Sequence, residues 1–497
     1  MSATQALDSI QALIRSNRLG AARTAIRRLC CRKPSSRSEV VRLAHLARLV
    51  LLPEKSLELL HRRVRAGRAP GKATDDEIAE YGMALAHVNA SAESIELLSR
   101  LDLKKFPFIF APLCLAYFRQ ARWEITLPMI KRYLSLKSLS SGDRLNGRRL
   151  LGTALLHGKR DFGAAQQLLE TVLVEAERDG YPLILREVRL MLIQCYFNQR
   201  IWRKARAQLA ELKRALPEDE GAIFSLNRLQ WQALVDYYAG NDPDRALADL
   251  QDVRRRFAEI GRSWNVRSCF YYEAILTQRK ELLVEYYFGT PYPKWRARIL
   301  ASARCTVDSL PEFLDWQISS SGAPGKYFVN LLTGQTSQTT VRLKPGQIPW
   351  RVLQALASDF FAPPSIAQLF ESLYPGEHFH PTAAPARVHQ SLLQTREWLD
   401  EHRLPLQIVE ENGCYRLRSQ HSFVLRLPRD KPAEADKSSA AYVVWAQTHF
   451  GDREFSSQEL ADKLGVSERS VRRSLKLAVA QGQLAGGSRR SRYRVRS

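Results

Sequence analysis

The chain has 497 residues, which is too long for a single hydrophobic core, so we expect two to four domains. Its formal net charge of +24 and pI near 9.9 favour a polyanionic partner such as nucleic acid, an anionic membrane surface or an acidic protein. No apolar stretch approaches the roughly 18 residues of a membrane span, and the N-terminus lacks a signal-peptide apolar core, so we expect a cytoplasmic protein without a membrane partner.

The first three hundred residues contain a repeat. Seven amphipathic helical segments each carry a small residue near their start, and successive small residues are 34, 38, 32, 39, 40 and 41 residues apart. That spacing accommodates a helix, a turn and a second helix in every unit. A small side chain there lets two helices approach closely. The seven positions are Ala22, Ser56, Ser94, Thr126, Ala165, Ala205 and Ala246.

The repeat length and the small-residue position resemble tetratricopeptide repeats over about residues 10–300. The resemblance implies an N-terminal α-solenoid, assigned to residues 1–312, whose concave surface binds a protein or peptide or another copy of the chain. The alternative is a spacer or dimerisation arm with an empty groove. We expect the aromatic residues of this region to pack in the core or between repeats: Tyr237, Tyr238, Tyr271, Tyr272, Tyr286 and Tyr287.

A Ser/Gly/Pro-rich linker at 313–325 precedes a second unit at 326–420, whose sequence pattern differs from that of the helical repeats. Alternating residues first predict two or three short strands, and three amphipathic segments then predict helices. Asn412-Gly413 predicts a closing hairpin. Strands, three helices and the ending "GCYRL" resemble the OmpR/PhoB-type winged-helix domain.

This second resemblance implies that the helix beginning near Ala384 enters the major groove of DNA. Its candidate DNA-binding residues are Arg387, Gln390 and Gln394. The hairpin, however, carries Glu410 and Glu411, which would oppose a phosphate backbone. A winged-helix fold kept for packing or dimerisation is therefore an open alternative.

A charged, proline-bearing linker at 421–437 leads to the C-terminal unit, 438–497. Its "ADKLGVSERSVRRSLKL" predicts a helix, a tight turn after Leu464 and a second helix that Ser467 can cap. At 100° per residue, apolar side chains fall on one side of this second helix and cations span about 100° of the other. The apolar positions are Val471, Leu475 and Ala478, and the cationic ones are Arg469, Arg472, Arg473 and Lys476.

The last 31 residues contain nine Lys or Arg residues and one Glu, a third of the net charge of the chain. Two helices, a basic helix and a basic hairpin resemble a winged helix-turn-helix DNA-binding domain. The resemblance implies base contacts from the helix and backbone contacts from the hairpin. The candidate DNA-binding residues are Ser467, Arg469, Ser470, Arg472, Arg473, Lys476, Arg489, Arg490, Arg492 and Arg494.

Signatures of enzymes are absent from the sequence. Neither Gly-Lys pair has the glycine spacing and following Ser/Thr of a phosphate-binding loop, and no nucleophile elbow or paired zinc-ligand motif occurs. The seven cysteines include no C-x-x-C pair and are expected to be reduced core residues. We therefore expect no catalytic residues, no metal and no cofactor.

These patterns predict a mainly α protein: a tetratricopeptide-like α-solenoid followed by two small α+β winged-helix domains. The leading hypothesis is a sequence-selective transcription regulator that binds double-stranded DNA. Its helical arm would bind a protein or peptide partner or hold a homo-oligomer, most simply a dimer. The alternatives are a protein-interaction scaffold whose winged helices bind protein, and a DNA-binding factor in DNA maintenance or phage defence.

Overall fold

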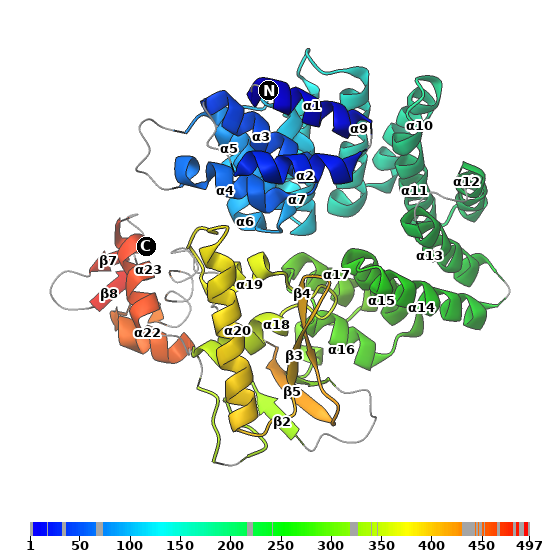
Figure 1. Cartoon of the computed structure of the whole chain (residues 1–497). Helices are drawn as coiled ribbons and strands as arrows, with labels where there is room; N and C mark the ends of the chain where they lie inside the picture. Colours follow the sequence, from blue (N-terminus) through cyan, green and yellow to red (C-terminus); the bar gives the residue numbers. More distant parts are fainter. Residues whose placement is uncertain are drawn as a thin grey trace. The chain divides into compact units, whose positions relative to one another are not determined.

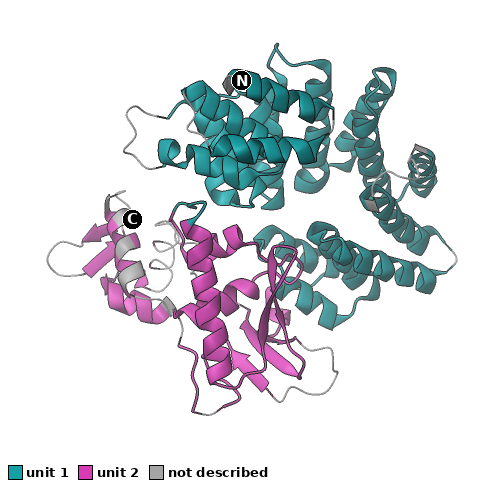
Figure 2. Ribbon diagram, in the orientation of Figure 1, with its two compact units in different colours: residues 1–305, 378–382 teal, residues 306–377, 383–497 magenta. Residues whose placement is uncertain are grey.

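The chain is mainly α-helical and divides into two compact units (Figure 2). One unit comprises Met1–Cys305 with His378–Thr382, and the other comprises Thr306–Glu377 with Ala383–Ser497. The computed structural model describes residues 3–495 except 17, 32–35, 66–72, 216–221, 241, 319–326, 339, 345, 430–442, 444–445, 447–449, 452, 465–467, 481–483 and 487–491.

The first unit consists of helices that follow one another in antiparallel pairs, from the blue to the green part of the chain (Figure 1). Consecutive helices pack on each other along the chain. They are α1 (Ala3–Arg15), α2 (Leu19–Cys30), α3 (Arg37–Leu49), α4 (Pro53–Val64), α5 (Asp75–His87), α6 (Ser91–Leu98), α7 (Phe110–Arg119), α8 (Trp123–Leu134), α9 (Ser141–Ala154), α10 (Phe162–Arg178), α11 (Pro182–Asn198), α12 (Trp202–Ala215), α13 (Ala222–Ala239), α14 (Pro243–Glu259), α15 (Ser263–Thr277), α16 (Lys280–Phe288) and α17 (Pro293–Ala303), with short turns η1 (Pro107–Ile109) and η2 (Leu155–Lys159).

The seven small residues of the sequence repeat are all buried, and each lies in the second helix of a pair. The predicted helical repeat is therefore confirmed. In α6 the hydroxyl of Ser94 donates to the carbonyl of Gly82 in α5 at 2.7 Å. A Cβ on Gly82 would lie 2.7 Å from Cδ2 of Leu98, and one on Gly152 in α9 would lie 2.6 Å from Cδ2 of Leu169. Small residues on both helices of a pair thus allow the two helices to pack closely.

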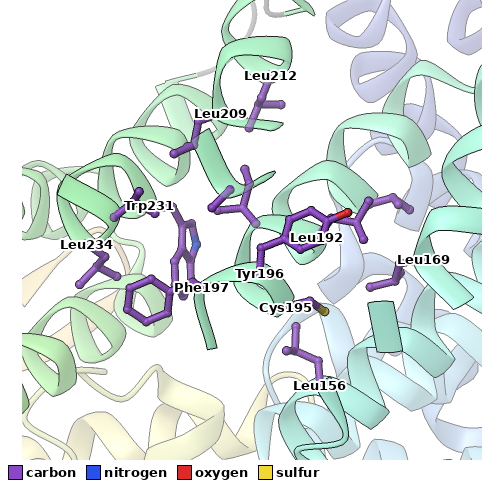
Figure 3. Packing of buried hydrophobic residues seen from close by; sticks show 14 of the residues in the cluster. Leu156, Leu169, Leu192, Cys195, Tyr196, Phe197, Leu209, Leu212, Trp231 and Leu234 are labelled. Atoms are coloured by element: carbon purple, nitrogen blue, oxygen red, sulfur yellow. The ribbon is translucent and has the colours of Figure 1, made fainter. Parts of the chain in front are cut away.

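Apolar side chains on both helices of each pair join into a continuous core through α9–α15 (Figure 3). Leu169 of α10, Leu192 of α11 and Leu209 of α12 are almost completely buried. The ring of Phe197 lies edge-on to Trp231, with centroids 5.5 Å apart. Because each pair buries its apolar faces against the next pair, neighbouring repeats stabilise one another.

Two strands of the second unit, β1 (Phe313–Gln317) and β5 (Phe423–Pro428), were not predicted from the sequence. β1 lies within the expected linker 313–325, and β5 lies within the expected linker 421–437. They pair antiparallel, and β2 (Tyr327–Asn330) pairs with β5 in parallel, which gives the sheet order β1-β5-β2. Phe423 and Leu425 are fully buried, so β5 supplies core contacts that a solvated linker could not.

Three helices and a hairpin lie between β2 and β5, close to the predicted positions. The helices are α18 (Ile348–Leu356), α19 (Ile366–Leu373) and α20 (Ala383–Glu401). The strands β3 (Gln407–Glu411) and β4 (Cys414–Arg418) pair antiparallel. Asn412 and Gly413 between them have φ angles of 53° and 75°, the left-handed geometry that a two-residue hairpin turn requires.

The C-terminal part of the second unit has a small core of its own. Its elements are β6 (Phe455–Ser456), α22 (Ser457–Leu464), α23 (Glu468–Ala480), β7 (Leu484–Gly486) and β8 (Arg492–Val495), with sheet order β6-β8-β7. Ser456 and Glu459 form a reciprocal cap at the start of α22: the Ser456 N–H donates to Glu459 at 2.6 Å, and the Glu459 N–H donates to the Ser456 hydroxyl at 3.1 Å.

Further features of the described residues concern membrane spans, metal ligands and cysteines. Among these residues, no helix is long and apolar enough to cross a membrane. No group of three or more metal-ligating side chains occurs in this part of the chain. All seven cysteines are free, and Cys114, Cys195 and Cys269 are buried in the core as expected. Cys31 is exposed, and Cys30, Cys305 and Cys414 are only partly buried, so the expected core position is wrong for these four.

The buried small residues lead to a stability prediction with a matched control inside one helix. In α12, Ala205 is fully buried and Ala207 is exposed. We expect Ala205→Leu to lower the free energy of unfolding by about 1–3 kcal/mol because the larger side chain forces the packed helices apart. Ala207→Leu should change it by less than about 0.5 kcal/mol. Urea unfolding of both variants, followed by circular dichroism, tests this, and equal effects would contradict the close packing at Ala205.

Candidate functional site

The helix α23 separates an apolar side from a cationic one. Val471, Leu475 and Ala478 are fully buried in the C-terminal core, whereas Arg472 and Lys476 are exposed. The predicted division of this helix into two sides therefore holds for these five side chains. Three further candidates, Arg469, Ser470 and Arg473, belong to α23, but their side chains lie outside the described residues, as does the whole of Ser467.

The strand β8 adds two more exposed cations to the same unit. Arg492 and Arg494 are exposed, while Tyr493 between them is only 3% exposed and packs in the core. The alternation of a strand places Arg492 and Arg494 on the face opposite Tyr493. Arg489 and Arg490 lie outside the described residues. The structure thus presents guanidinium groups on a strand of the sheet that packs with α23.

Arg472 is partly neutralised within its own helix. Its guanidinium forms an ion pair with the carboxylate of Glu468, four residues earlier. Glu468 also accepts a hydrogen bond from the hydroxyl of Ser457 at 2.9 Å. The hydrogen bond from Ser457 and the contact with Arg472 lower the pKa of Glu468, so the carboxylate is held in its charged form. An anion that binds Arg472 must compete with Glu468.

The candidates on α20 form a separate face in the middle of the second unit. Arg387, Gln390 and Gln394 are exposed and lie on one side of the helix. Arg387 is already engaged: it forms an ion pair with Glu377, and its guanidinium lies 3.8 Å from the ring centroid of Tyr374. Gln390 and Gln394 therefore offer the more accessible polar groups of this face.

The acidic residues of the β3–β4 hairpin are engaged as well. Glu411 forms ion pairs with Arg416 and Arg418, and Glu410 accepts a hydrogen bond from the Tyr415 hydroxyl at 3.1 Å. The two negative charges of these carboxylates are therefore matched by the two positive charges of Arg416 and Arg418 within the same hairpin. The repulsion of a phosphate backbone by these carboxylates is consequently weaker than the sequence alone suggested.

A cavity of about 380 Å³ lies within the first unit, lined by η2, α11, α13, α15, α16 and α17. Its walls include aromatic rings that the sequence interpretation assigned to packing, namely Tyr271, Tyr272 and Tyr286. Trp264 and Trp295 also line it, with ring centroids 5.2 Å apart. A cavity of this size with aromatic walls is typical of a small-ligand site.

Polar groups of two neighbouring repeats meet in the cavity wall. The Asn265 side-chain amide donates to the Asn227 side-chain carbonyl at 2.8 Å, and the Gln230 amide donates to the Ser268 hydroxyl at 2.9 Å. Each bond joins α13 to α15 across 38 residues of sequence. The carbonyl oxygen of Gln230 is buried, and it has no hydrogen-bond partner among the described residues.

Arg298 of α17 brings a positive charge to this cavity. Its guanidinium lies 4.5 Å from the ring centroid of Trp295 and donates to the carbonyl of His157 at 3.2 Å. No carboxylate among the described residues is ion-paired with it. Burial, followed by the charges of Arg298 and Arg160, lowers the pKa of His157 to about 3, so this imidazole is neutral at physiological pH.

Sequence reasoning missed this cavity. Aromatic residues in a helical repeat usually pack in the core, and Tyr286, Trp231 and Gln230 are indeed almost fully buried. The available signal was the coincidence of asparagine, glutamine and arginine with tryptophan and tyrosine on the first helices of neighbouring repeats. Only the curvature of the stacked helices shows that these positions surround a space.

Comparisons with solved structures found neighbours of low sequence identity. No family model and no curated protein matches the chain. The apo form of RapI is 11% identical to it over 57% of this chain and 85% of that chain, with a TM-score of 0.42. A Rap protein complexed with competence and sporulation factor is 10% identical over 81% of this chain and 99% of that chain, with a TM-score of 0.45.

The lowered pKa of His157 leads to a prediction about pH. Its folded-state pKa of about 3 lies below the ordinary value of 6.5, so its contribution to stability is complete above pH 6.5 and is lost as the pH falls toward 3. Between pH 6.5 and 5 we expect the free energy of unfolding to fall by about 1–2 kcal/mol more in the wild type than in His157→Gln. Urea unfolding at several pH values measures the difference, and parallel pH profiles would contradict it.

Proposed function

We propose that the protein is a DNA-binding regulator whose C-terminal residues 455–495 bind duplex DNA through α23 and β8. The observation that carries this proposal is the distribution of the described cations. Arg472 and Lys476 are exposed on the side of α23 opposite the buried Val471 and Leu475. A helix of this kind fits the major groove of DNA, and arginine suits bidentate contact with guanine.

The β-sheet beside α23 has a different role in this proposal. Arg492 and Arg494 are exposed on β8, which pairs with β6 on one side and β7 on the other. Guanidinium groups on a strand next to a groove-binding helix favour contacts with backbone phosphates. The strand therefore supplies affinity for any sequence, whereas α23 supplies selectivity.

The middle of the second unit extends this DNA footprint or organises a dimer. Gln390 and Gln394 are exposed on α20, and glutamine can pair with adenine in the major groove. Arg387 would have to leave Glu377 before it could bind a phosphate. The face of α20 is thus suited to weak, additional contacts rather than to the main ones.

The helical-repeat arm would bind a protein or peptide partner, or a second copy of the chain. Such a partner could bias the orientation or oligomeric state of the DNA-binding unit without a catalytic step. Stacked helical repeats present extended surfaces that suit this role. Regulation by association is therefore part of the proposal, and the arm and the C-terminal unit have separate tasks in it.

A protein-interaction scaffold is the second candidate function, and one observation on α20 favours it. Leu393 is 45% exposed on this helix, directly before Gln394 and three residues after Gln390 in the sequence. An exposed leucine suits a protein contact better than a phosphate backbone. Partner binding that persists after nuclease treatment would support the scaffold, whereas a neighbouring replication or nuclease gene would support a DNA-maintenance factor.

The two cationic elements should contribute differently to DNA binding. In the full-length protein, Arg472→Gln with Lys476→Gln should reduce discrimination between a preferred duplex and a shuffled one at least tenfold, because base contacts are lost. Arg492→Gln with Arg494→Gln should weaken binding to both duplexes alike and lower the slope of log K against log salt by about 2. Fluorescence anisotropy between about 50 and 200 mM salt, on a duplex selected from a random pool, measures both quantities.

The matched control removes two exposed cations from the helical arm, with Lys213→Gln and Arg214→Gln in α12. This variant should keep the affinity and the salt slope of the wild type. Absence of saturable binding to any duplex at about 100 mM salt contradicts the proposed function. Identical behaviour of the α23 and β8 variants contradicts the division of roles.

Glu468 should restrain DNA binding because it competes for Arg472. Glu468→Gln removes the ion pair but keeps a carbonyl oxygen that can accept the hydrogen bond from Ser457. Solvent screens an exposed ion pair and keeps it weak, so we expect DNA affinity to rise only about two- to fivefold. Anisotropy at one salt concentration tests this, and unchanged or weaker binding would show that Arg472 is not at the interface.

A further inference from the structure

We propose that the cavity between α11, α13, α15 and α17 is a binding site for a small aromatic carboxylate that also carries an N–H or O–H donor. The site goes beyond the proposed DNA binding, because none of the residues that form it belongs to α23, β8 or α20. Three properties of the cavity support this ligand class: its aromatic walls, its positive charge and its buried polar atoms that have no partner among the described residues.

The volume and walls of the cavity suit a flat molecule. About 380 Å³ lies in the range of small-ligand sites. Trp231 and Tyr272 lie edge to face, with centroids 5.6 Å apart, and Trp264 and Trp295 do the same at 5.2 Å. Aromatic rings prefer offset-stacked or edge-to-face neighbours, so these walls favour an aromatic body over an aliphatic one.

The charges that line the cavity favour an anion. Arg298 has no ion-paired carboxylate among the described residues, and Arg267 is a second guanidinium in the wall. Glu187, the one acidic side chain that lines the cavity among the described residues, forms an ion pair with Arg149 at 3.0 Å. His157 also faces the cavity and is neutral. A carboxylate at Arg298 would compensate a guanidinium that sits among rings.

Two buried polar atoms indicate where the remaining hydrogen bonds of the ligand would form. The carbonyl oxygen of Gln230, whose residue is 1% exposed, has no partner among the described residues. The indole N–H of Trp295 is likewise buried, and no described residue accepts from it. Unsatisfied buried groups of this kind are costly, so a ligand that supplies one donor and one acceptor gains affinity.

Three probes that differ in one group each test the proposal on the wild-type, full-length protein. Indole-3-acetate carries the ring, the carboxylate and the N–H. Indole-3-acetamide lacks the charge, and 1-methylindole-3-acetate lacks the donor. By isothermal titration calorimetry we expect one saturable site for indole-3-acetate and at least tenfold weaker binding of each of the other two.

Variants connect the two preferences to individual side chains. Arg298→Gln should abolish the preference for indole-3-acetate over the acetamide, and Gln230→Leu should abolish its preference over the 1-methyl compound. The control Arg214→Gln removes an exposed arginine of the same unit and should leave all three affinities unchanged. Because the comparison of probes uses the wild type, it stays decisive even if a variant does not fold.

The outcomes separate the proposal from its rivals. No saturable binding of indole-3-acetate up to 5 mM, or equal affinities for the three probes, overturns it. A peptide that ends in tryptophan presents the same carboxylate at a chain terminus. If such a peptide binds more tightly than indole-3-acetate, the site belongs to a protein terminus and the assignment to a small molecule is overturned.

Discussion

The close contact between paired helices is the constraint on which the first unit depends. It requires a small residue where the second helix of each pair meets the first, and all seven such residues are buried. Gly82 and Gly152 on the first helix have no side chain, and a leucine of the second helix of the same pair occupies the space beside each of them. Repeated without interruption, this contact stacks the pairs into one body and places their first helices side by side.

That arrangement creates both the core of the first unit and its cavity. Leu192, Phe197 and Trp231 pack into the shared core. Gln230 of α13 and Asn265 of α15, in contrast, form hydrogen bonds with polar groups of the neighbouring repeat. Most buried polar groups in proteins find partners, so the unpartnered carbonyl of Gln230 is an exception that calls for a physical reason. A bound ligand would supply that reason, since the cost of an unsatisfied group is removed when a donor reaches it.

In α23 and β8 of the second unit, buried apolar side chains and exposed cationic side chains lie within a few residues of each other. Val471 and Leu475 are buried beside the exposed Arg472 and Lys476, and Tyr493 is buried between two exposed arginines. The helix and the strand can therefore keep their core contacts while their cations bind an anion. On α20 the balance differs, because Arg387 is held by Glu377 and the hairpin acids are held by arginines. The two parts of this unit consequently differ in how readily they attract a polyanion.

The sequence by itself determined the helical repeat, the positions of α18–α20, the Asn-Gly hairpin and the two sides of α23. These features arise from local periodicity and turn chemistry, which are properties of consecutive residues. Only the tertiary structure decided that Phe313–Gln317 and Phe423–Pro428 are paired strands, since their partners lie about a hundred residues apart. It also decided that Arg472 and Arg387 are ion-paired and that tyrosines assigned to packing surround a cavity. Pairings and spaces of this kind depend on how distant segments approach, which no local pattern specifies.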